Sequence, residues 1–278
     1  MMATDVCGHW ICAVTFDLWS TLLFEREGAS QKRADSRCRN LARALSTLGV
    51  RVSFEDVSAA IDETVSSLMT AWEKNRDIGH VEQIQLIIRK VFKDSLRLKR
   101  EWMNRLVSAY NQSVHEVPPC LNTEALDVLE GLKNRGMYIG LICNTGLTPG
   151  IMLREFLANE GVAEYFDSMI FSEEIGIRKP DPRIFRLAAR RMRVRPRGIV
   201  HIGDNLKADV WGAQKAGLKA IYLSGQKGRD QMAESDPNSL LSLCRRLDKL
   251  EGLTVVPDKT ICSLSELASA LMELERKM

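Results

Sequence analysis

The sequence predicts a doubly wound α/β fold, in which helices cover both faces of a mostly parallel sheet, with an inserted all-helical domain. Short apolar runs rich in Val and Ile recur along the chain, and helical patterns alternate with them from the second run onward. The interval between the first two runs carries helical patterns only. With 278 residues, 45% of them apolar, the chain can form a large core and an inserted unit.

The apolar runs have the length and composition of strands that are buried on both faces, as in a parallel sheet. Each run is ended by polar residues or glycine. The predicted strands are Cys12–Asp17, Tyr138–Asn144, Ser168–Phe171, Ile199–Gly203 and Ala220–Leu223.

Helices are predicted between these strands over Asn122–Arg135, Pro182–Met192 and Ala208–Ala216. In a doubly wound sheet, the carboxyl ends of the strands line the ligand crevice. Polar side chains stand at three of these ends, and we expect them to converge in one crevice. They are Asp17, Asn144 and Asp204.

The segment 25–110 reads as an all-helical insertion of about four helices, and Ser53 is the predicted N-cap of one of them. Val114–Pro119 resembles a linker that returns the chain to the core. The predicted organisation is therefore an α/β core made of residues 1–24 and 111–278 and a helical domain made of residues 25–110.

After the last core strand, the segment Gly225–Asp236 is polar and turn-rich, and leucines spaced along 240–250 predict an amphipathic helix. Lys259–Ser263 is a candidate edge strand. A final helix is predicted over Ser265–Leu274, with Ser265 as its N-cap.

Composition argues against several classes of partner. A formal net charge of +3 is too small to indicate nucleic-acid binding, and the basic cluster Arg190–Arg197 reads as a solvated turn. No apolar stretch approaches the ~20 residues of a membrane span. The 7 cysteines include no CxxC pair and suit reduced thiols in a cytoplasmic protein. We therefore expect a small-molecule partner, and a homodimer stays open.

Three acidic residues indicate a metal site. Asp17 ends a buried strand, and burying a carboxylate is costly unless it is satisfied. Asp204 and Asp209, within Gly203–Asp209 (GDNLKAD), bring two more carboxylates towards the same crevice. Like charges this close require a cation, and oxygen ligands favour Mg²⁺. Lys179 can balance these carboxylates and hold an anionic group.

Four short motifs occur in a fixed order: FDLWSTL, LICNTG, RKPDPRIF and HIGDNLKADVWGAQKAG. Together they resemble the motifs of the haloacid dehalogenase-like (HAD) hydrolase superfamily, and the resemblance covers the chain from about Ala13 to Leu223. It implies a Rossmann-like core, and the helical insertion after the first motif resembles the cap of the dehalogenase and phosphoglycolate-phosphatase branch. By this resemblance Asp17 is the nucleophile and Lys179 the motif-three lysine, and Cys143 stands at the motif-two Ser or Thr, followed by Asn144.

The same resemblance implies that Mg²⁺ is bound by Asp17, by the backbone carbonyl of Trp19, and by the motif-four acids Asp204 and Asp209. Cys143, Asn144, Thr145 and Lys179 would contact the substrate.

The sequence departs from the family at two of these positions. Phosphatases of the superfamily usually carry a second aspartate two residues after the nucleophile, and it protonates the leaving group. Trp19 stands there, and an indole does no acid–base chemistry at neutral pH. An aromatic residue at this position resembles the dehalogenase branch, which usually lacks the Asp204–Asp209 pair. Cys143 replaces a hydroxyl by a weaker donor, and Thr145 could compensate.

Three functions remain open on these residues. The first is Mg²⁺-dependent hydrolysis of a small phosphorylated metabolite through an aspartyl-phosphate on Asp17. The second is haloacid dehalogenation through an Asp17 ester, which should survive removal of metal. The third is a pseudo-enzyme or binding module that keeps the fold and the metal. Substrate choice would depend on cap residues, for which the polar candidates are Arg33, Arg37, Trp72 and His80.

Overall fold

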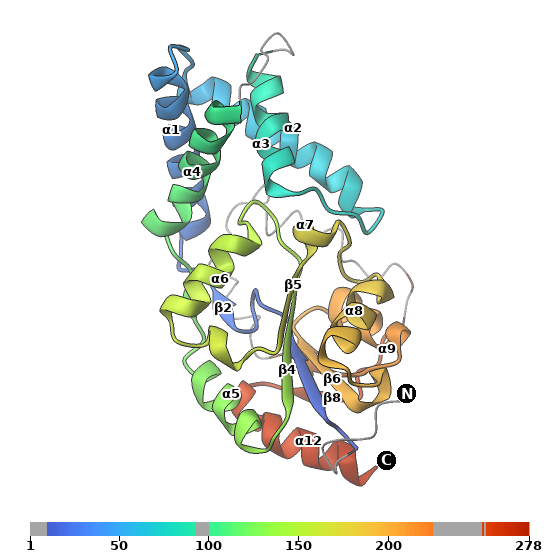
Figure 1. The fold of residues 1–278 in the computed structure, drawn as a ribbon. Coiled ribbons are helices and arrows are strands. Elements are labelled where there is room, and N and C mark those ends of the chain that lie inside the picture. The colour runs from blue at the N-terminus through green and yellow to red at the C-terminus, as the bar shows by residue number, and fades with distance from the viewer. Residues whose placement is uncertain (1–9, 93–99, 225–251, 253, 278) are drawn as a thin grey trace.

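The computed structural model describes residues 10–92, 100–224, 252 and 254–277. A twisted sheet with helices on both sides forms its lower part, and a bundle of helices stands above one edge of that sheet (Figure 1). The predicted leucine-rich helix near residues 240–250 lies outside the described residues.

The main sheet has six parallel strands in the order β5-β4-β1-β6-β7-β8. All five predicted core strands are confirmed to within two residues at each end, and the candidate edge strand is β8, beside β7. β1 lies at the centre, and its four residues are all buried, as expected for a strand covered on both faces. The strands are β1 (Ala13–Phe16), β4 (Tyr138–Cys143), β5 (Ser168–Phe171), β6 (Ile199–Gly203), β7 (Lys219–Leu223) and β8 (Lys259–Ile261).

Helices cover the two faces of the sheet, and each face has its own apolar cluster. One face packs against α5 (Ala125–Asn134), α6 (Gly150–Asn159) and α12 (Leu267–Arg276). The other packs against α8 (Pro182–Met192) and α9 (Gly212–Ala216). The chain is therefore a three-layer α/β/α sandwich of the doubly wound type.

The bundle consists of α1 (Ala29–Thr47), α2 (Phe54–Trp72), α3 (His80–Val91) and α4 (Arg100–Glu116). It has its own apolar cluster, which includes Leu41, Leu45 and Leu68. Ser53 caps α2 as predicted, since its hydroxyl accepts from the amide of Asp56 while the Asp56 carboxylate accepts from the amide of Ser53.

The return from the bundle to the core differs from the prediction. The interval Val114–Pro119 is predicted to be a linker, but α4 continues to Glu116. Val114 is buried, so apolar packing extends the helix past the predicted boundary. The chain leaves and re-enters the core through a small antiparallel ribbon of β2 (Leu23–Phe24) and β3 (Cys120–Leu121).

Two helix starts also differ. The helix predicted over Ala208–Ala216 begins as a π-helical turn, Leu206–Trp211, before α9. The final helix begins at Leu267 and not after Ser265, because a 3₁₀ turn, Leu264–Glu266, precedes it, and Ser263 caps that turn through a capping box with Glu266. Further short helices are α7 (Ser172–Ile175) and the 3₁₀ turns Ala163–Tyr165 and Pro196–Gly198.

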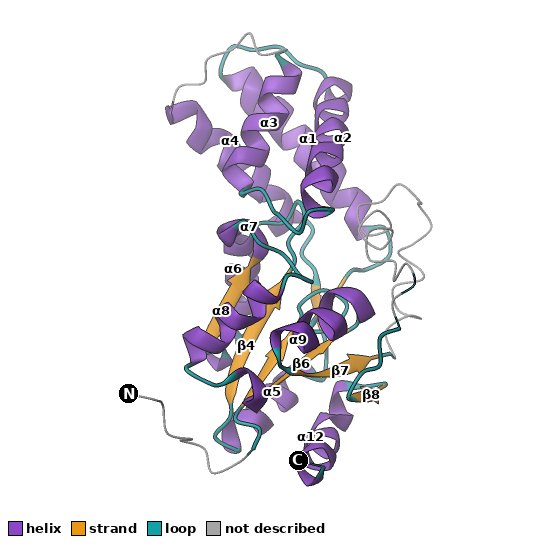
Figure 2. Ribbon diagram, turned by 90° about the vertical axis from the view of Figure 1, so that its right-hand side faces the viewer, coloured by secondary structure: helices purple, strands orange, loops and turns teal. Residues whose placement is uncertain are grey.

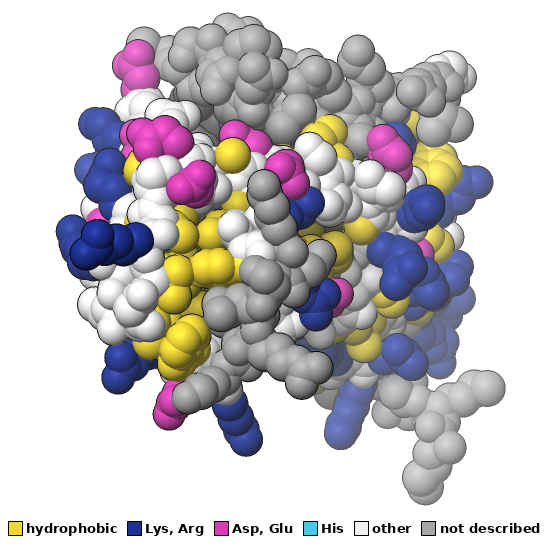
Figure 3. All heavy atoms as spheres, turned by 90° about the horizontal axis from the view of Figure 1, so that it is seen from above, with side chains coloured by type: hydrophobic (Ala, Val, Ile, Leu, Met, Phe, Trp, Pro, Cys, Tyr) yellow, Lys and Arg dark blue, Asp and Glu magenta, His cyan; other side chains and the backbone are white. Residues whose placement is uncertain are grey.

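Figure 2 shows the parallel strands running upward, so that their carboxyl ends face the helical bundle. Figure 3 looks down on the molecule from above the bundle. Lys and Arg side chains lie mostly towards the two sides of this face, with several Asp and Glu side chains between them, so the face presents charges of both signs. Within the described parts of the chain, every helix is too short or too polar to cross a membrane.

The cysteines follow the prediction at four described positions, which carry free thiols: Cys38, Cys120, Cys143 and Cys262. Cys12, however, is disulfide-bonded, so the expectation of reduced thiols is wrong at this residue. A disulfide depends on two sulfurs meeting in space, and spacing along the sequence does not reveal that.

Candidate active site

The predicted acidic residues converge at the carboxyl edge of the sheet. Asp17 directly follows β1, and its amide donates to the carbonyl of Ile202 on the neighbouring β6 at 2.8 Å. Asp204 directly follows β6, and Asp209 lies in the π-helical turn after it. Each of the three carboxylates offers an oxygen within 4.8 Å of the others. Neighbouring parallel strands therefore bring together residues that are far apart in the sequence.

Lys179 lies inside this cluster. Its ammonium donates to Oδ1 of Asp17 at 2.5 Å and to Oδ1 of Asp209 at 2.7 Å, and the residue is only 3% exposed. A buried ammonium is stable only when it is paired, and here two carboxylates pair with it. The predicted lysine and the predicted nucleophile are thus in direct contact.

Asn144, at the end of β4, holds the backbone of Lys179. The backbone N–H of Lys179 donates to Oδ1 of Asn144 at 2.8 Å, and Nδ2 of Asn144 donates to the carbonyl of Lys179 at 2.9 Å. The side chain that is predicted to contact substrate therefore also places the lysine.

The charges of the cluster shift the pKa values of its members. Burial raises the pKa of Asp17 to about 7 against the opposing effect of Lys179, and the Asp209 charge adds to the rise. Burial also acts to raise the pKa of Asp209, but Lys179 and His201 outweigh it and bring this pKa to about 2. Burial acts to lower the pKa of Lys179, but the two carboxylates raise it above its usual value. Lys179 and Asp209 therefore stay ionised at neutral pH.

Asp209 is fixed by its surroundings on several sides. Its Oδ2 accepts from the backbone amide of Asn205 at 3.0 Å, and its Oδ1 lies 3.2 Å from Nε2 of His201. A Cβ atom at Gly203 would come 2.2 Å from Oδ2 of Asp209, so only glycine leaves room for this carboxylate. The π-helical turn that carries Asp209 is a feature often found at functional sites.

His201 is a site residue that the sequence analysis did not identify. It is fully buried on β6, and burial lowers its pKa, so its ring is neutral. Since a carboxylate can only accept, Nε2 carries the proton and donates to Asp209, while Nδ1, at 2.9 Å, accepts from the hydroxyl of Thr15. A histidine inside a buried strand just before Gly-Asp is a signal that could have found it.

The cluster fits a divalent cation. Three carboxylates face one ammonium, which leaves an excess of negative charge in a largely buried place. The donors are all carboxylate oxygens, which are the ligands that a hard ion such as Mg²⁺ prefers. Asp17, Asp204 and Asp209 are the residues that would hold it.

The motif-two residues Cys143 and Thr145 are both buried. Cys143 is fully buried in the apolar cluster beside α5 and α6, and burial raises the pKa of its thiol well above the ordinary value. Thr145 has its hydroxyl 3.1 Å from Oγ of Ser172 and accepts from the amide of Glu173 at 3.2 Å. Its hydroxyl is therefore engaged by the core segment that follows β5.

Trp19 is half-buried and packs against the apolar cluster under the first face of the sheet. Its backbone forms an isolated bridge with Leu23 at the start of the ribbon. Ser20, which follows it, has a φ of 59°, in the left-handed region that closes this tight loop. The indole thus serves packing within the loop that carries Asp17.

The polar residues of the bundle that are candidates for substrate choice have partners outside the carboxylate cluster. Arg33 is buried and pairs with Glu25 at 2.5 Å. Arg37 donates to the carbonyl of Leu147 at 3.1 Å and lies over the ring of Tyr110. Nε1 of Trp72 donates to Asp77 at 2.9 Å, and Nδ1 of His80 lies 3.5 Å from Oε2 of Glu173.

A comparison with models of protein families finds that of the haloacid dehalogenase-like hydrolases, which matches residues 11–217. Among curated proteins, a glyceraldehyde 3-phosphate phosphatase of Methanopyrus kandleri is 28% identical over 256 residues, covering 86% of this chain and 99% of that protein. A phosphoserine phosphatase of Thermus thermophilus is 37% identical over 117 residues, covering 42% of this chain and 46% of that protein. The second match thus spans under half of the relative.

Among solved structures, a 2-haloacid dehalogenase of Pseudomonas syringae pv. Tomato superposes with a TM-score of 0.67. It is 24% identical, and the match covers 95% of this chain and 99% of that one. This likeness extends over the sheet, its flanking helices and the bundle. Because the two sequences are only 24% identical, the likeness shows a shared fold and nothing more.

Proposed function

The chain belongs to the haloacid dehalogenase-like hydrolases, and on that premise we propose that it is a Mg²⁺-dependent phosphatase of a small phosphorylated metabolite. The observation that carries the proposal is the convergence of Asp17, Asp204 and Asp209 around the ammonium of Lys179. A dehalogenating ester reaction needs only the nucleophile and a cation for the leaving group. A cluster of three carboxylates is costly without a metal, so it favours phosphoryl transfer.

In the proposed reaction, a carboxylate oxygen of Asp17 attacks phosphorus. The bond between phosphorus and the ester oxygen breaks, and the leaving group departs as an anion that takes a proton from solvent water, while an aspartyl-phosphate forms on Asp17. Water then attacks this phosphorus and breaks its bond to the Asp17 oxygen, which releases inorganic phosphate, returns the proton of the water to solvent and regenerates the carboxylate. Lys179 stabilises the negative charge that develops on the phosphoryl oxygens.

Bound Mg²⁺, held by Asp17, Asp204 and Asp209 and by the backbone carbonyl of Trp19, would neutralise phosphoryl charge and orient the substrate. Asp209 keeps Lys179 in place from the opposite side and is itself oriented by His201. The end of β4 would line the phosphoryl site with Cys143, Asn144 and Thr145. Asn144 would act chiefly by holding Lys179, and Thr145 by its hydrogen bond to Ser172.

The names of two relatives support a substrate class. The protein from Methanopyrus kandleri, matched over nearly its whole length, is named for a three-carbon phosphate ester, and the one from Thermus thermophilus for phosphoserine. We propose a substrate of similar size that is enclosed between the carboxyl edge of the sheet and the helical cap, residues 25–110. A cytoplasmic site of action belongs to the same proposal.

The test is a hydrolysis panel of small phosphate esters and 2-haloacids, measured with Mg²⁺ and with EDTA, for the wild type and for Asp17→Asn. We expect phosphate release that needs Mg²⁺ and disappears in Asp17→Asn. Halide release that survives EDTA would establish the dehalogenase instead. Mg²⁺ binding by calorimetry without turnover of any ester would make the protein a binding module, and absence of Mg²⁺ binding at millimolar concentration would remove the proposal.

A further inference from the structure

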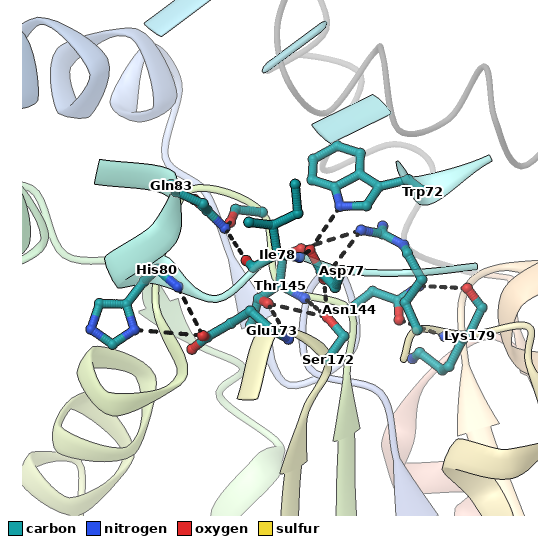
Figure 4. A network of polar contacts seen from close by, with 12 residues as sticks. Trp72, Asp77, Ile78, His80, Gln83, Asn144, Thr145, Ser172, Glu173 and Lys179 are labelled. Atoms are coloured by element: carbon teal, nitrogen blue, oxygen red, sulfur yellow. Dashed lines mark hydrogen bonds and ion pairs between the residues drawn. The ribbon is translucent and has the colours of Figure 1, made fainter. Parts of the chain in front are cut away.

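The helical bundle contacts the core far from the two segments that connect them. The loop between α2 and α3, residues 73–79, lies along the core segment 172–179, which ends at Lys179 (Figure 4). The amide of Asp77 donates to the carbonyl of Gly176 at 3.2 Å, and the amide of Arg178 donates to the carbonyl of Asn75 at 3.2 Å. Between these bonds, Arg76 and Ile177 form an isolated antiparallel bridge.

The carboxylate of Asp77 joins the two sides of this contact. Its Oδ1 accepts from Nε1 of Trp72 and from the amide of Ile78, both at 2.9 Å and both within the bundle. Its Oδ2 faces the core, where it accepts from the hydroxyl of Ser172 at 2.5 Å and lies 3.4 Å from Nη1 of Arg178. The two oxygens of one buried carboxylate thus serve two different parts of the molecule.

The core side of the contact leads to the carboxyl ends of two strands. Oγ of Ser172, just after β5, accepts from the amide of Thr145, just after β4, at 2.9 Å. The guanidinium of Arg178 lies 4.2 Å from the centre of the Trp72 ring, which adds a cation–π contact. Arg178 is buried, so its charge needs the carboxylate of Asp77.

A second acidic residue strengthens the same contact. Glu173 accepts from the amide of His80, at the start of α3, at 3.2 Å and from the amide of Gly150, at the start of α6, at 3.0 Å. Residues 172–178 are therefore held to the bundle by two carboxylates, Asp77 from the bundle and Glu173 from the core.

We propose that Asp77 is a positioning residue for Lys179, which it holds in place through Arg178 and Ser172. This inference rests on the proposed phosphatase function. Lys179 is the residue directly after Arg178, so the Asp77–Arg178 pair holds the chain on one side of the lysine peptide while Asn144 holds that peptide itself. Packing within the bundle would require only Oδ1 of Asp77, which binds Trp72 and Ile78. Oδ2 of Asp77 instead binds Ser172 and Arg178 of the core. The contact between the bundle and the core segment thus adds to the support that Asn144, Asp17 and Asp209 give Lys179 from within the core.

The test is the substitution Asp77→Asn, which keeps an oxygen for Trp72 and Ile78 but places an amide opposite Ser172 and Arg178. Hydrogen bonds to charged groups are worth enough to change a rate roughly tenfold to a hundredfold when lost. We expect kcat for the best substrate of the panel to fall by about that factor, with KM changed by less than about threefold and Mg²⁺ affinity unchanged.

Glu63→Gln is the matched control. It is the same carboxylate-to-amide change at a residue of α2 that pairs with Lys90 of α3 at 3.2 Å on the exposed surface of the bundle. This control should keep kcat. If Asp77→Asn does not fold, Arg178→Gln removes the same pair from the other side and is expected to show the same loss of kcat.

Amide hydrogen exchange gives a readout that does not depend on turnover. In Asp77→Asn, peptides that cover residues 174–179 should exchange at least about tenfold faster than in wild type, and in Glu63→Gln they should not. A wild type that hydrolyses no phosphate ester would overturn the proposed function, and exchange alone would then decide whether Asp77 fixes this segment. Unchanged exchange overturns the positioning role, as does faster exchange in an active enzyme whose kcat is unchanged.

Discussion

The side-chain amide of Asn144 and the backbone of Lys179 exchange two hydrogen bonds, of 2.8 and 2.9 Å. The pair closes a ring between the end of β4 and the segment that follows β5 and α7. A lysine on a four-carbon stem is flexible, and holding its peptide removes part of the freedom that its ammonium would otherwise have. The ammonium then reaches the Asp17 carboxylate without further adjustment.

Asn144→Ala should therefore lower kcat by roughly tenfold to a hundredfold, because both bonds to the Lys179 backbone are lost while Asp17 and the acidic cluster stay in place. Steady-state kinetics with the best phosphate ester measures this. Asn40→Ala, which removes an amide that bonds Ser36 on the bundle, is the control and should keep kcat. Equal activity of wild type and Asn144→Ala would show that Lys179 does not need this support.

The strands were the part of the fold most readily predicted from the sequence. A parallel strand is buried on both faces, so a short apolar run such as Ile199–Gly203, ended by glycine, indicates one directly. Convergence of Asp17 and Asp204 followed, because both stand directly after neighbouring strands. Asp209 was predictable for another reason, since it stands five residues after Asp204 in the GDNLKAD stretch.

Features that depend on contacts between distant segments were not predictable. Asp77 reads as an ordinary loop aspartate, and its partners Ser172 and Arg178 are 95 and 101 positions away. The helix α4 runs past its predicted end because Val114 is buried by packing, which no local pattern indicates. Burial and partners of this kind appear only when the segments are assembled.

Gly203→Ala should weaken the metal site without removing a ligand. The added methyl would overlap the Asp209 carboxylate, at 2.2 Å from Oδ2 and 2.7 Å from Cβ, so that side chain must move. We expect the Mg²⁺ dissociation constant to rise by roughly tenfold or more, measured by calorimetry. Gly131→Ala, on α5 with nothing within 4 Å of the added carbon, is the control and should bind Mg²⁺ as wild type does. Unchanged binding in Gly203→Ala would place the ion away from Asp209.

Asp17→Asn should stabilise the metal-free protein at alkaline pH. The pKa of Asp17 is raised in the folded state from 3.8 to about 7, so between these values the folded protein holds a proton that the unfolded chain has released. Stability from this residue is therefore largest below pH 3.8 and is lost as pH rises towards 7. Above pH 7 the buried, ionised carboxylate lowers the free energy of unfolding of the wild type by its full amount. The variant has no carboxylate at this position and avoids this loss.

The measurement is thermal unfolding in EDTA from pH 5 to pH 8. The melting temperature of Asp17→Asn should exceed that of wild type by roughly a few degrees at pH 8, and the difference should narrow towards pH 5. Millimolar Mg²⁺ should raise the melting temperature of the wild type more than that of the variant, because a ligand stabilises the state that binds it. A variant no more stable than wild type at pH 8 in EDTA would contradict the pKa assignment.

The last prediction concerns Trp19, whose indole packs against the apolar cluster where an acid is usual in phosphatases of this family. If the leaving group receives no proton from the protein, the rate should depend steeply on its pKa. Acetyl phosphate and p-nitrophenyl phosphate release stable anions, acetate and p-nitrophenolate. The wild type should then hydrolyse both much faster than alkyl phosphates. A leaving-group series measures this slope.

Trp19→Asp should help the alkyl phosphates most, because only they need protonation in the transition state. General acid catalysis is worth roughly 10²–10⁴-fold, which sets the upper limit of the gain. The gain will be smaller to the extent that the new carboxylate loses the packing of the indole and adds negative charge beside Asp17. Trp19→Phe, which keeps an aromatic ring without a proton donor, is the control and should keep the steep slope. A flat slope in wild type, or a folded Trp19→Asp that is no better on alkyl phosphates, would identify Trp19 as a wall of the substrate pocket and favour carbon–halogen hydrolysis.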